Sequence, residues 1–298
     1  MSSVLSLSHI AKAYGPVKAL RDVSFSVPEG AVFGILGPNG SGKTTLLSIV
    51  LDVLNADGGH YRWFGEPGSP AQRRKIGSLL ETPNFYHYLS AVDNLKITQS
   101  ISGRGTEADI LEVLKKVNLY ERRKSRFKSY SLGMKQRLAI AAALLGDPKV
   151  LVLDEPTNGL DPVGIAEIRA LINELRNSGH TIIMASHLLD EVEKVCTHVA
   201  ILKTGQLVTT GEVNEVLQDE DVVEAAAADT DALVRALASF GNRISRQAPE
   251  GTVQLALEKG TANLEAINRH CFSEGIVLRH LILRKKRLET RFFELTNN

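Results

Sequence analysis

The residues best suited to chemistry lie in a glycine-rich stretch, GPNGSGKTT, at positions 37–45. Its spacing, G-x-x-x-x-G-K-[ST], is typical of a loop whose backbone N–H groups surround phosphate oxygens. Glycine in this loop permits a tight turn and a close approach of the backbone to the ligand. The Lys43 ammonium can reach the β- and γ-phosphates of a nucleoside triphosphate, and the Thr44 hydroxyl can bind Mg²⁺. The residues expected to surround the phosphates are Gly37, Pro38, Asn39, Gly40, Ser41, Gly42, Lys43, Thr44 and Thr45.

Two adjacent acids, Asp154 and Glu155, end the apolar run in VLVLDEP at residues 150–156. An open parallel sheet binds its ligand at the carboxyl ends of its strands, so acids placed there can face a bound nucleotide. We expect Asp154 to hold Mg²⁺, directly or through a water. We expect Glu155, which points differently along the strand, to polarise the attacking water as a general base. An acid pair alone is more often a strand-end cap, and it gains meaning here because a phosphate loop precedes it.

These motifs need strands and helices that bring them together. A short apolar strand, GAVFGIL, precedes the glycine-rich loop, and a helical pattern, TTLLSIVLDVL, follows it. The apolar runs KVLVLDEP and TIIMASH are too short for helices and are typical of strands buried on both faces. A helical pattern, PVGIAEIRALINELRNSG, separates the two runs. Residues 1 to about 215 are therefore predicted to form an α/β domain with a largely parallel sheet.

Two subdomains accompany this sheet. The alternating segments LSLSHI and VSFSV predict an antiparallel N-terminal sheet, with AYGPVKALRD between them as a polar loop. Residues 84–146 are predicted to form a helical subdomain, because TEADILEVLKKVNL is amphipathic and KQRLAIAAALLG is strongly apolar.

The composition changes near residue 219. Residues 219–298 are expected to contain strand, helix, strand, strand, helix, strand and a final helix, an order that suits a small two-layer α+β domain. We therefore divide the chain into a nucleotide-binding domain of residues 1–218 and an accessory domain of residues 219–298. Two roles stay open for the accessory domain: it tunes the geometry of a dimer, or it only stabilises the chain.

Composition and charge exclude several classes of protein. The 298 residues are 43% hydrophobic and 23% charged, with a formal net charge of +1, which gives no basis for a nucleic-acid partner. The basic run RKKR at 284–287 is better explained by a solvated helix face than by a binding patch. Cys196 and Cys271 are too few for a disulfide framework. No apolar stretch reaches the length of about 18 residues that a membrane helix needs, and the N-terminus lacks the pattern of a secretory signal.

With these motifs in place, the chain resembles the ATP-binding subunits of ABC transporters, from residue 4 to about residue 215. The segment YSLGMKQR at 130–137 is similar to the signature segment of that family. Ser131 and Gly133 match the positions that bind the γ-phosphate of the ATP held by the opposite subunit. Leu132 and Met134 depart from the common LSGGQ spelling, which leaves the hydroxyl and backbone contacts possible but weakens the motif taken alone.

Three more residues gain a role from this resemblance. NGLDP matches the loop after the second acid and implies that Asp161 lies at the junction between subunits. The segment ASH supplies His187, whose imidazole could hydrogen-bond the γ-phosphate and position the water. Tyr14, in AYGPVKAL, matches the aromatic residue on which adenine stacks. The alternative for Tyr14 is a tyrosine that only packs in the core or a hairpin.

Glu81, in LLETPNFY at 79–86, is a candidate metal ligand. The sequence resembles the drug, bacitracin and lantibiotic exporter branch, of which many members carry glutamate where most ABC proteins carry glutamine after this strand. A carboxylate oxygen is a good ligand for Mg²⁺. We expect Thr44, Asp154 and Glu81 to surround the metal, with Glu81 engaging the metal or its water when two subunits close. The alternative is a solvated acid beside Pro83.

The resemblance implies an ATPase that uses ATP and Mg²⁺ and works as a homodimer. In this family the phosphate loop and the signature segment lie at opposite ends of one subunit, so each ATP is completed only when two copies meet head to tail. We expect such a dimer at the cytoplasmic face of the cell membrane, where it drives separate transmembrane permease subunits. The segment NFYHYLSAVDNL, just after Glu81, suits docking of that partner. The exporter branch implies a drug, an antimicrobial peptide or a lipid-like cargo.

A soluble ABC ATPase that acts on ribosomes or DNA is the alternative function. Ribosome-acting members carry two ATP-binding modules in one chain, and DNA-repair members insert long coiled coils into the module. This sequence has one phosphate loop and no such insert. A P-loop phosphotransferase of another kind does not explain YSLGMKQR and ASH together.

Overall fold

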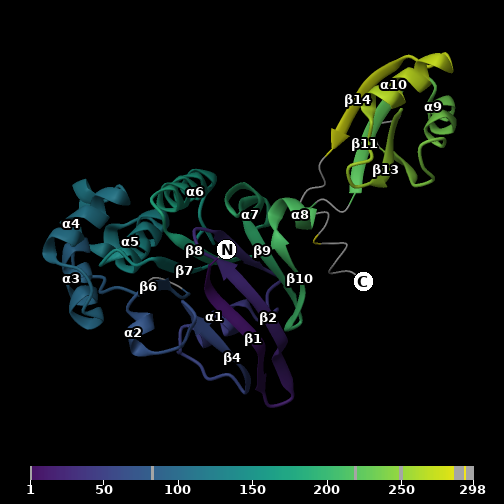
Figure 1. Cartoon of the computed structure of the whole chain (residues 1–298). Coiled ribbons are helices and arrows are strands. Elements are labelled where there is room, and N and C mark those ends of the chain that lie inside the picture. The colour runs from purple at the N-terminus through teal and green to yellow at the C-terminus, as the bar shows by residue number, and fades with distance from the viewer. Residues whose placement is uncertain (1, 82–83, 218–219, 248–250, 285–291, 293–298) are drawn as a thin grey trace. The chain divides into compact units, whose positions relative to one another are not determined.

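The computed structural model describes residues 2–81, 84–217, 220–247, 251–284 and 292 (Figure 1). The chain divides into two compact units, Met1–Glu212 and Val213–Asn298. The domain boundary expected between residues 218 and 219 lies outside the described residues. The final helix expected near the C-terminus also falls largely outside them. The two units are described one at a time.

The first unit is built around a mainly parallel sheet with the strand order β10-β9-β3-β8-β7-β6. Only β10 pairs antiparallel, with β9, at one edge. All residues of β3, β7 and β8 are buried, which explains their continuous apolar sequences. The strands are β3 (Val32–Leu36), β6 (Ile76–Leu79), β7 (Val150–Asp154), β8 (Thr181–Ser186), β9 (His198–Lys203) and β10 (Gln206–Glu212). The predicted α/β fold with a largely parallel sheet is confirmed.

Three helices connect these strands: α1 (Lys43–Val50), α6 (Pro162–Asn177) and α7 (Leu189–Val195). Helix α1 is shorter than the predicted TTLLSIVLDVL, because Asp52 adopts a left-handed conformation with φ of 62°. The indole N–H of Trp63 donates to the carbonyl of Val50 over 2.7 Å and so satisfies an acceptor at the helix end.

An antiparallel sheet with the order β2-β1-β4-β5 packs its apolar side chains against α1. Its strands are β1 (Ser3–Tyr14), β2 (Val17–Pro28), β4 (Gly58–Trp63) and β5 (Glu66–Pro67). The prediction that AYGPVKALRD forms a polar loop is wrong, because only Gly15 and Pro16 separate β1 from β2. Register shifts between residues 7 and 13 of β1 break the strict alternation of apolar and polar residues, so the sequence pattern does not predict a strand there.

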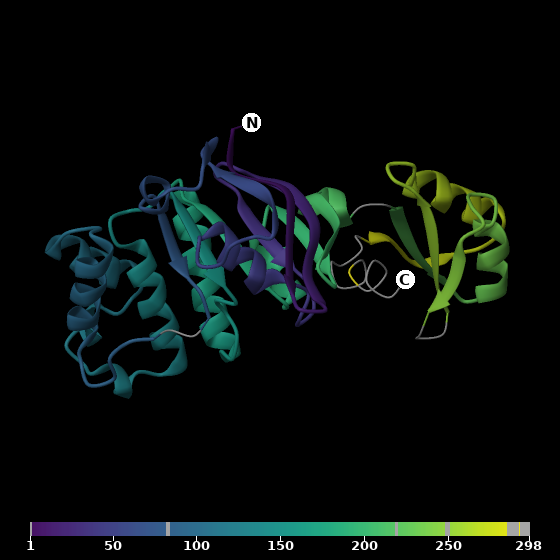
Figure 2. The same ribbon diagram turned by 90° about the horizontal axis from the view of Figure 1, so that it is seen from below.

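The predicted helical subdomain contains α3 (Ala91–Ser102), α4 (Glu107–Lys116) and α5 (Leu132–Leu144), with short 3₁₀ turns at Tyr120–Arg122 and Phe127–Ser129. Figures 1 and 2 both show these helices as a lobe beyond β6 and β7. A short helix, α2 (Pro70–Arg73), precedes β6. The Thr106 and Asp109 side chains form a capping box at the start of α4, which fixes where that helix begins.

The second unit begins with the short helix α8 (Val213–Leu217) and continues strand, helix, strand, strand, helix, strand, in the order predicted. Its antiparallel sheet has the order β12-β13-β11-β14, and apolar side chains of β11 and β13 meet those of the two helices in one core. The elements are β11 (Glu220–Ala227), α9 (Thr230–Leu237), β12 (Ile244–Gln247), β13 (Thr252–Glu258), α10 (Leu264–Ser273) and β14 (Leu278–Arg284).

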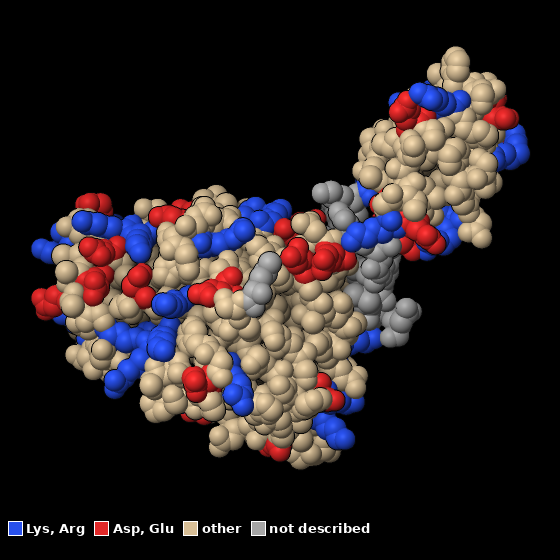
Figure 3. All heavy atoms as spheres, viewed as in Figure 1, with Lys and Arg blue, Asp and Glu red and all other residues tan. Residues whose placement is uncertain are grey.

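Basic and acidic side chains alternate over the face of the first unit drawn in Figure 3, which agrees with the net charge of +1. Throughout the described part of the chain, no helix is both long enough and apolar enough to span a bilayer. Both cysteines are free and buried.

Candidate nucleotide site

Sheet register brings the predicted site residues together. In β3, Leu36 pairs with Ser186 of β8, and in β7, Asp154 pairs with Ala185 of the same strand. The residues that follow, Gly37, Glu155 and His187, therefore leave the sheet at one edge. These are the carboxyl ends of parallel strands, where this kind of sheet binds ligands.

The glycine-rich loop turns tightly between β3 and α1. Gly40 and Gly42 have φ of 79° and 103°, in the left-handed region that favours glycine. A Cβ atom at residue 42 would lie 2.6 Å from the carbonyl oxygen of Ala19, so this position also lacks room for a side chain. The ammonium of Lys43, 6% exposed, donates to the carbonyls of Gly37 and Pro38 over 2.8 and 3.3 Å.

Asp154 is buried at the end of β7, with 3% of its surface exposed. Burial raises the pKa of its carboxyl group, while a hydrogen bond from the Thr44 side chain works in the opposite direction. Negative charge on Glu155 and Glu81 adds to the rise, and Lys43 opposes it. In the described part of the chain, Oδ1 of Asp154 has no hydrogen-bond partner. This orphaned acceptor fits a cation or an ordered water beside Thr44.

Glu155 stands between two other site residues. Its Oε2 lies 2.8 Å from Nδ1 of His187, and its Oε1 lies 3.7 Å from Nζ of Lys43. The backbone of Glu155 is held in the left-handed region, with φ of 48°, while its amide donates to the carbonyl of Ala185 over 3.0 Å. A non-glycine residue in this conformation is strained, and such strain is typical of functional sites.

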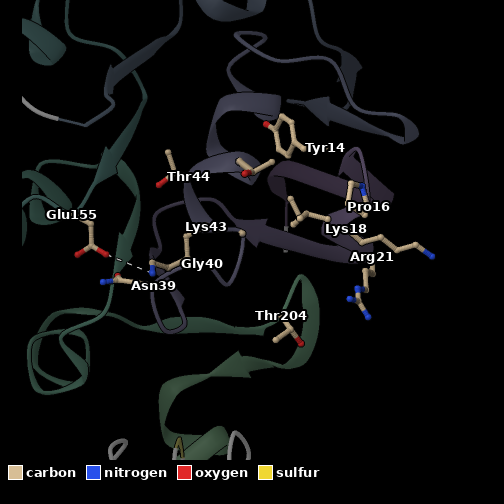
Figure 4. Close-up of a pocket in the computed structure, with 14 residues that line it drawn as sticks. Tyr14, Pro16, Lys18, Arg21, Asn39, Gly40, Lys43, Thr44, Glu155 and Thr204 are labelled. Atoms are coloured by element: carbon tan, nitrogen blue, oxygen red, sulfur yellow. Dashed lines mark ion pairs between the residues drawn. The ribbon is translucent and has the colours of Figure 1, made fainter.

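A cavity of about 610 Å³ extends from the glycine-rich loop to Tyr14. Figure 4 shows Asn39, Lys43, Thr44 and Glu155 at one side and Tyr14 at the other. The Tyr14 ring is about half exposed, and Nζ of Lys12 lies 5.8 Å from its centroid. The lining residues are Tyr14, Pro16, Val17, Lys18, Ala19, Arg21, Asn39, Gly40, Gly42, Lys43, Thr44, Thr45, Glu155 and Thr204.

Sequence reasoning missed several residues of this cavity, among them Lys18, Arg21 and Thr204. They belong to no motif, and they come from β2 and from the turn between β9 and β10. Register explains their presence, because Arg21 donates its amide to the carbonyl of Gly205 over 2.6 Å. Conversely, Gly37, Pro38 and Ser41 support the loop and do not line the cavity. Ser41 is buried under it, with 1% of its surface exposed.

Glu81 is exposed and follows β6 by two residues, with φ of 56°. Leu79 pairs with Leu153, so Glu81 leaves the sheet next to Asp154 and Glu155. It does not line the cavity, but its charge contributes to the raised pKa of Asp154. Pro83, beside which a solvated acid was the alternative, lies outside the described residues.

Ser131, Gly133 and Asp161 lie together in a second cavity of about 450 Å³. Ser131 caps the start of α5 by accepting from the amide of Met134 over 3.3 Å, and Asp161 caps the start of α6 by accepting from Gly164 over 3.0 Å. Two long helices thus present their positive N-termini to one cavity, which the carboxylates of Asp161 and Glu167 and the guanidinium of Arg137 also line. The structure does not bring these residues into the cavity of Lys43.

A metal that binds here needs ligands from outside the protein as well. In the residues that the structure describes, no group of three or more His, Cys, Asp or Glu side chains is arranged to hold a metal ion. Mg²⁺ is usually bound through one or two protein oxygens together with substrate phosphates and waters. The pair of Thr44 and Asp154 beside a phosphate loop fits that requirement.

Comparison with known proteins agrees with this geometry. The family model described as ABC transporter matches residues 20–158. The lantibiotic transport ATP-binding protein SrtF of Streptococcus pyogenes is 40% identical over 205 residues, 69% of this chain and 89% of that protein. The bacitracin transport ATP-binding protein BcrA of Enterococcus faecalis is 32% identical over 300 residues, 99% of this chain and 97% of that protein.

Solved structures give the same result for the fold. The ADP conformation of an ATP-binding cassette of an ABC transporter has a TM-score of 0.66 and 28% identity, over 72% of this chain and 93% of the other. A dimeric ATP-binding cassette in a post-hydrolysis state, bound to ADP and Pi, has a TM-score of 0.62 and 26% identity, over 70% of this chain and 98% of the other.

The fold and the site thus define a P-loop ATPase module of the ABC type. The chain belongs to the family of ABC transporter ATP-binding proteins. Such subunits bind nucleotide and couple ATP hydrolysis to transport, so the resemblance noted in the sequence is confirmed.

Proposed function

We propose that this chain is the Mg²⁺-dependent ATPase of an exporter, and that it drives separate transmembrane permease subunits from the cytoplasmic face of the cell membrane. The observation that carries the proposal is a single cavity that joins Tyr14, the phosphate loop and Glu155. Its lining suits a nucleotide with the base at Tyr14 and the phosphates at Lys43. The exposed Tyr14 ring at that end supports the proposal that adenine stacks on it.

The residues of the chain divide the work of hydrolysis. Lys43 and the loop amides neutralise the β- and γ-phosphates. Glu155 accepts a proton from a water molecule while the oxygen of that water attacks the γ-phosphorus. The bond between the γ-phosphorus and the oxygen that bridges it to the β-phosphate then breaks, and ADP is the leaving group. His187, hydrogen-bonded to Glu155, orients that carboxylate. Mg²⁺ bound to Thr44 and Asp154 would neutralise phosphate charge, and Glu81 is proposed to engage the metal or its water on closure.

Completion of each ATP site needs a second copy of the chain. Ser131, Gly133 and Asp161 lie in the second cavity, where two helix N-termini favour an anion. We infer that this cavity receives the γ-phosphate of ATP held by the other subunit. The dimeric cassette bound to ADP and Pi supports such a pairing for this fold.

The names of the relatives support a proposal for the cargo class. BcrA and SrtF are named for transport of bacitracin and of a lantibiotic, and the match to BcrA extends through the second unit. We propose a drug, an antimicrobial peptide or a lipid-like molecule as the exported substrate. The second unit, without a predicted catalytic residue, is proposed to tune the geometry of the dimer.

The test is phosphate release by the purified full chain with Mg²⁺ and with excess EDTA, using Glu155→Gln as the control. Hydrolysis is expected only with Mg²⁺, and Glu155→Gln should release phosphate about 10²- to 10⁴-fold more slowly than the parent protein. Equal phosphate release from the parent and the variant would exclude the proposed general base. Export is tested separately, by co-expression with candidate transmembrane permease subunits and measurement of resistance to bacitracin or a lantibiotic.

A further inference from the structure

Helix α6 carries two charged residues, Glu167 and Arg169, that reach different neighbouring helices. In an α-helix of 3.6 residues per turn, positions two residues apart point about 200° away from each other. The two side chains therefore leave α6 on opposite sides. Figure 1 shows α6 with α5 on one side and α7 on the other.

The first contact joins α6 to the helix that starts at Ser131. Oε2 of Glu167 lies 3.6 Å from Nη2 of Arg137 on α5, and both side chains line the second cavity. The Arg137 side chain is 15% exposed and also donates to the carbonyl of Val117 over 3.4 Å. Since α5 and α6 start at the same cavity, this pair links the two helices close to their N-termini, although the Glu167 side chain is 47% exposed.

The second contact joins α6 to the helix that follows His187. Nε of Arg169 lies 3.3 Å from Oε2 of Glu191, whose side chain is only 12% exposed. Lys194 also approaches Glu191, at 3.6 Å, but both residues lie on α7, so this contact does not link α7 to another helix. Arg169 thus links α6 to α7 through its ion pair with Glu191.

Neither contact is in its best geometry. Among the described residues, Nε of Arg137, Nε of Arg169 and Oε2 of Glu191 are buried without a hydrogen-bond partner. A buried charged atom without such a bond is costly, so a small movement of α6 that brings Nε of Arg169 and Oε2 of Glu191 into hydrogen-bonding geometry is favourable. The position of α6 is therefore sensitive to what happens at α5 and at α7.

We propose that α6 is a relay between the two nucleotide sites of the dimer, with Glu167 and Arg169 as positioning residues. This inference rests on the proposed ATP-dependent dimer. The nucleotide site of the same subunit reaches α6 through the loop that joins Glu155 to the start of the helix, and through His187, α7 and Arg169 along its length. The other copy's ATP reaches α6 through Ser131, α5, Arg137 and Glu167. Movement at either nucleotide site therefore shifts the position of α6, and coupling between two sites requires such a shared element.

The relay predicts an effect on cooperativity. In the full chain, Glu167→Gln and Arg169→Gln are expected to lower kcat about threefold to tenfold, within the range for coupling residues, and to bring the Hill coefficient for ATP toward one. ADP binding to the single subunit should stay within about twofold, because neither residue touches that site. The charge swap Arg169→Glu with Glu191→Arg should restore cooperativity.

Matched controls lie on the same helix. Glu174→Gln and Arg176→Gln remove the same charges from exposed positions of α6 and should behave as the parent. If the parent hydrolyses ATP cooperatively and all four single variants match it, the relay is wrong and the proposed function stands. If ATP hydrolysis by the parent is not cooperative, the relay proposal is also wrong. If the parent neither hydrolyses ATP nor dimerises with it, both proposals fall.

A loss of stability in a variant can be distinguished from a loss of coupling between the two nucleotide sites. A pair that only stabilises the chain would lower the melting temperature and leave the Hill coefficient unchanged. Should Arg169→Gln fail to fold, the swapped protein decides: a folded, cooperative swap supports the relay, and a folded swap with a Hill coefficient of one contradicts it.

Discussion

Nδ1 of His187 lies 2.8 Å from Oε2 of Glu155, while the second oxygen of the same carboxylate lies 3.7 Å from Nζ of Lys43. Glu155 and His187 follow β7 and β8, whose pairing makes them neighbours, and the glycine-rich loop between β3 and α1 brings Lys43 to them. Glu155 thus faces the cation of the phosphate loop with one oxygen and an imidazole with the other. This arrangement suits a base that must be held in place while it accepts a proton.

Glu155→Gln should keep nucleotide binding and lower turnover about 10²- to 10⁴-fold, the range for loss of a general base. The amide is isosteric, so its contacts with His187 can persist. Bound but uncleaved ATP should then hold two copies together, which size-exclusion chromatography with Mg·ATP would detect. Only monomer in that experiment, with ATP bound, would contradict the dimer scheme.

Lys43→Ala should weaken ATP binding about 10- to 150-fold, corresponding to a charge-assisted hydrogen bond of about 1.5–3 kcal/mol. Lys43 also holds the loop through the carbonyls of Gly37 and Pro38. Titration with a fluorescent ATP analogue measures the change. Lys124→Ala, at an exposed position, is the matched control. Equal affinity in both variants would remove the phosphate-loop assignment.

Asp154→Asn should stabilise the nucleotide-free chain at neutral pH. It should also abolish the stimulation of ATP hydrolysis by Mg²⁺. Burial raises the pKa of Asp154, so its ionised form costs stability in the folded state. Relief of an unsatisfied buried charge is worth about 1 kcal/mol, or roughly 2–4 °C in melting temperature. Differential scanning calorimetry measures it, with exposed Glu112→Gln as control.

The same variant makes a prediction about pH. A raised folded-state pKa means that the protonated acid is favoured by folding, so the parent loses stability relative to the variant as pH rises through the folded pKa. Below the ordinary value of 3.8 both side chains are neutral, and the two melting temperatures should converge. A constant difference from pH 3 to pH 7 would show that ionisation of Asp154 is not the cause.

Substitutions of Glu81 are expected to affect the coupling of ATP hydrolysis to transport more than they affect ATP binding. Glu81→Gln should retain the fold and most of the ATP affinity, because the side chain is exposed and does not line the nucleotide cavity. Glu81→Ala should reduce transport-coupled turnover in the complex with the membrane subunits more than the glutamine variant does. Resistance assays alongside Mg²⁺ titrations measure this. Unchanged transport and Mg²⁺ dependence in Glu81→Ala would make Glu81 a solvated acid.

The accessory domain is expected to be dispensable for nucleotide binding. The first unit has its own core, and its nucleotide cavity is lined entirely by residues before position 205. A chain that ends at residue 218 should therefore fold and bind ATP within about threefold of the full chain, since distant sites contribute independently. Circular dichroism and nucleotide titration check this. Loss of binding would make the C-terminal residues integral to the nucleotide module.

The sequence by itself determined the motifs and the strands and helices that carry them. The glycine-rich loop could be recognised because its function is local: backbone amides, a lysine and a helix start lie within nine residues. The buried strands β7 and β8 could be recognised because strands buried on both faces have continuous apolar sequences. The β1–β2 hairpin could not, since register shifts erase the alternation that marks a strand.

The tertiary structure decided which residues meet. The contact of His187 with Glu155 joins residues 32 positions apart, and it depends on the pairing of β7 with β8, which no local pattern records. Arg21 and Thr204 reach the nucleotide cavity only through the pairing of separate segments. The opposite sides on which Glu167 and Arg169 leave α6 follow from helix geometry, but their partners, Arg137 and Glu191, follow from packing. Spacing along a chain fixes local geometry, whereas neighbours across a fold are set by the burial of whole elements.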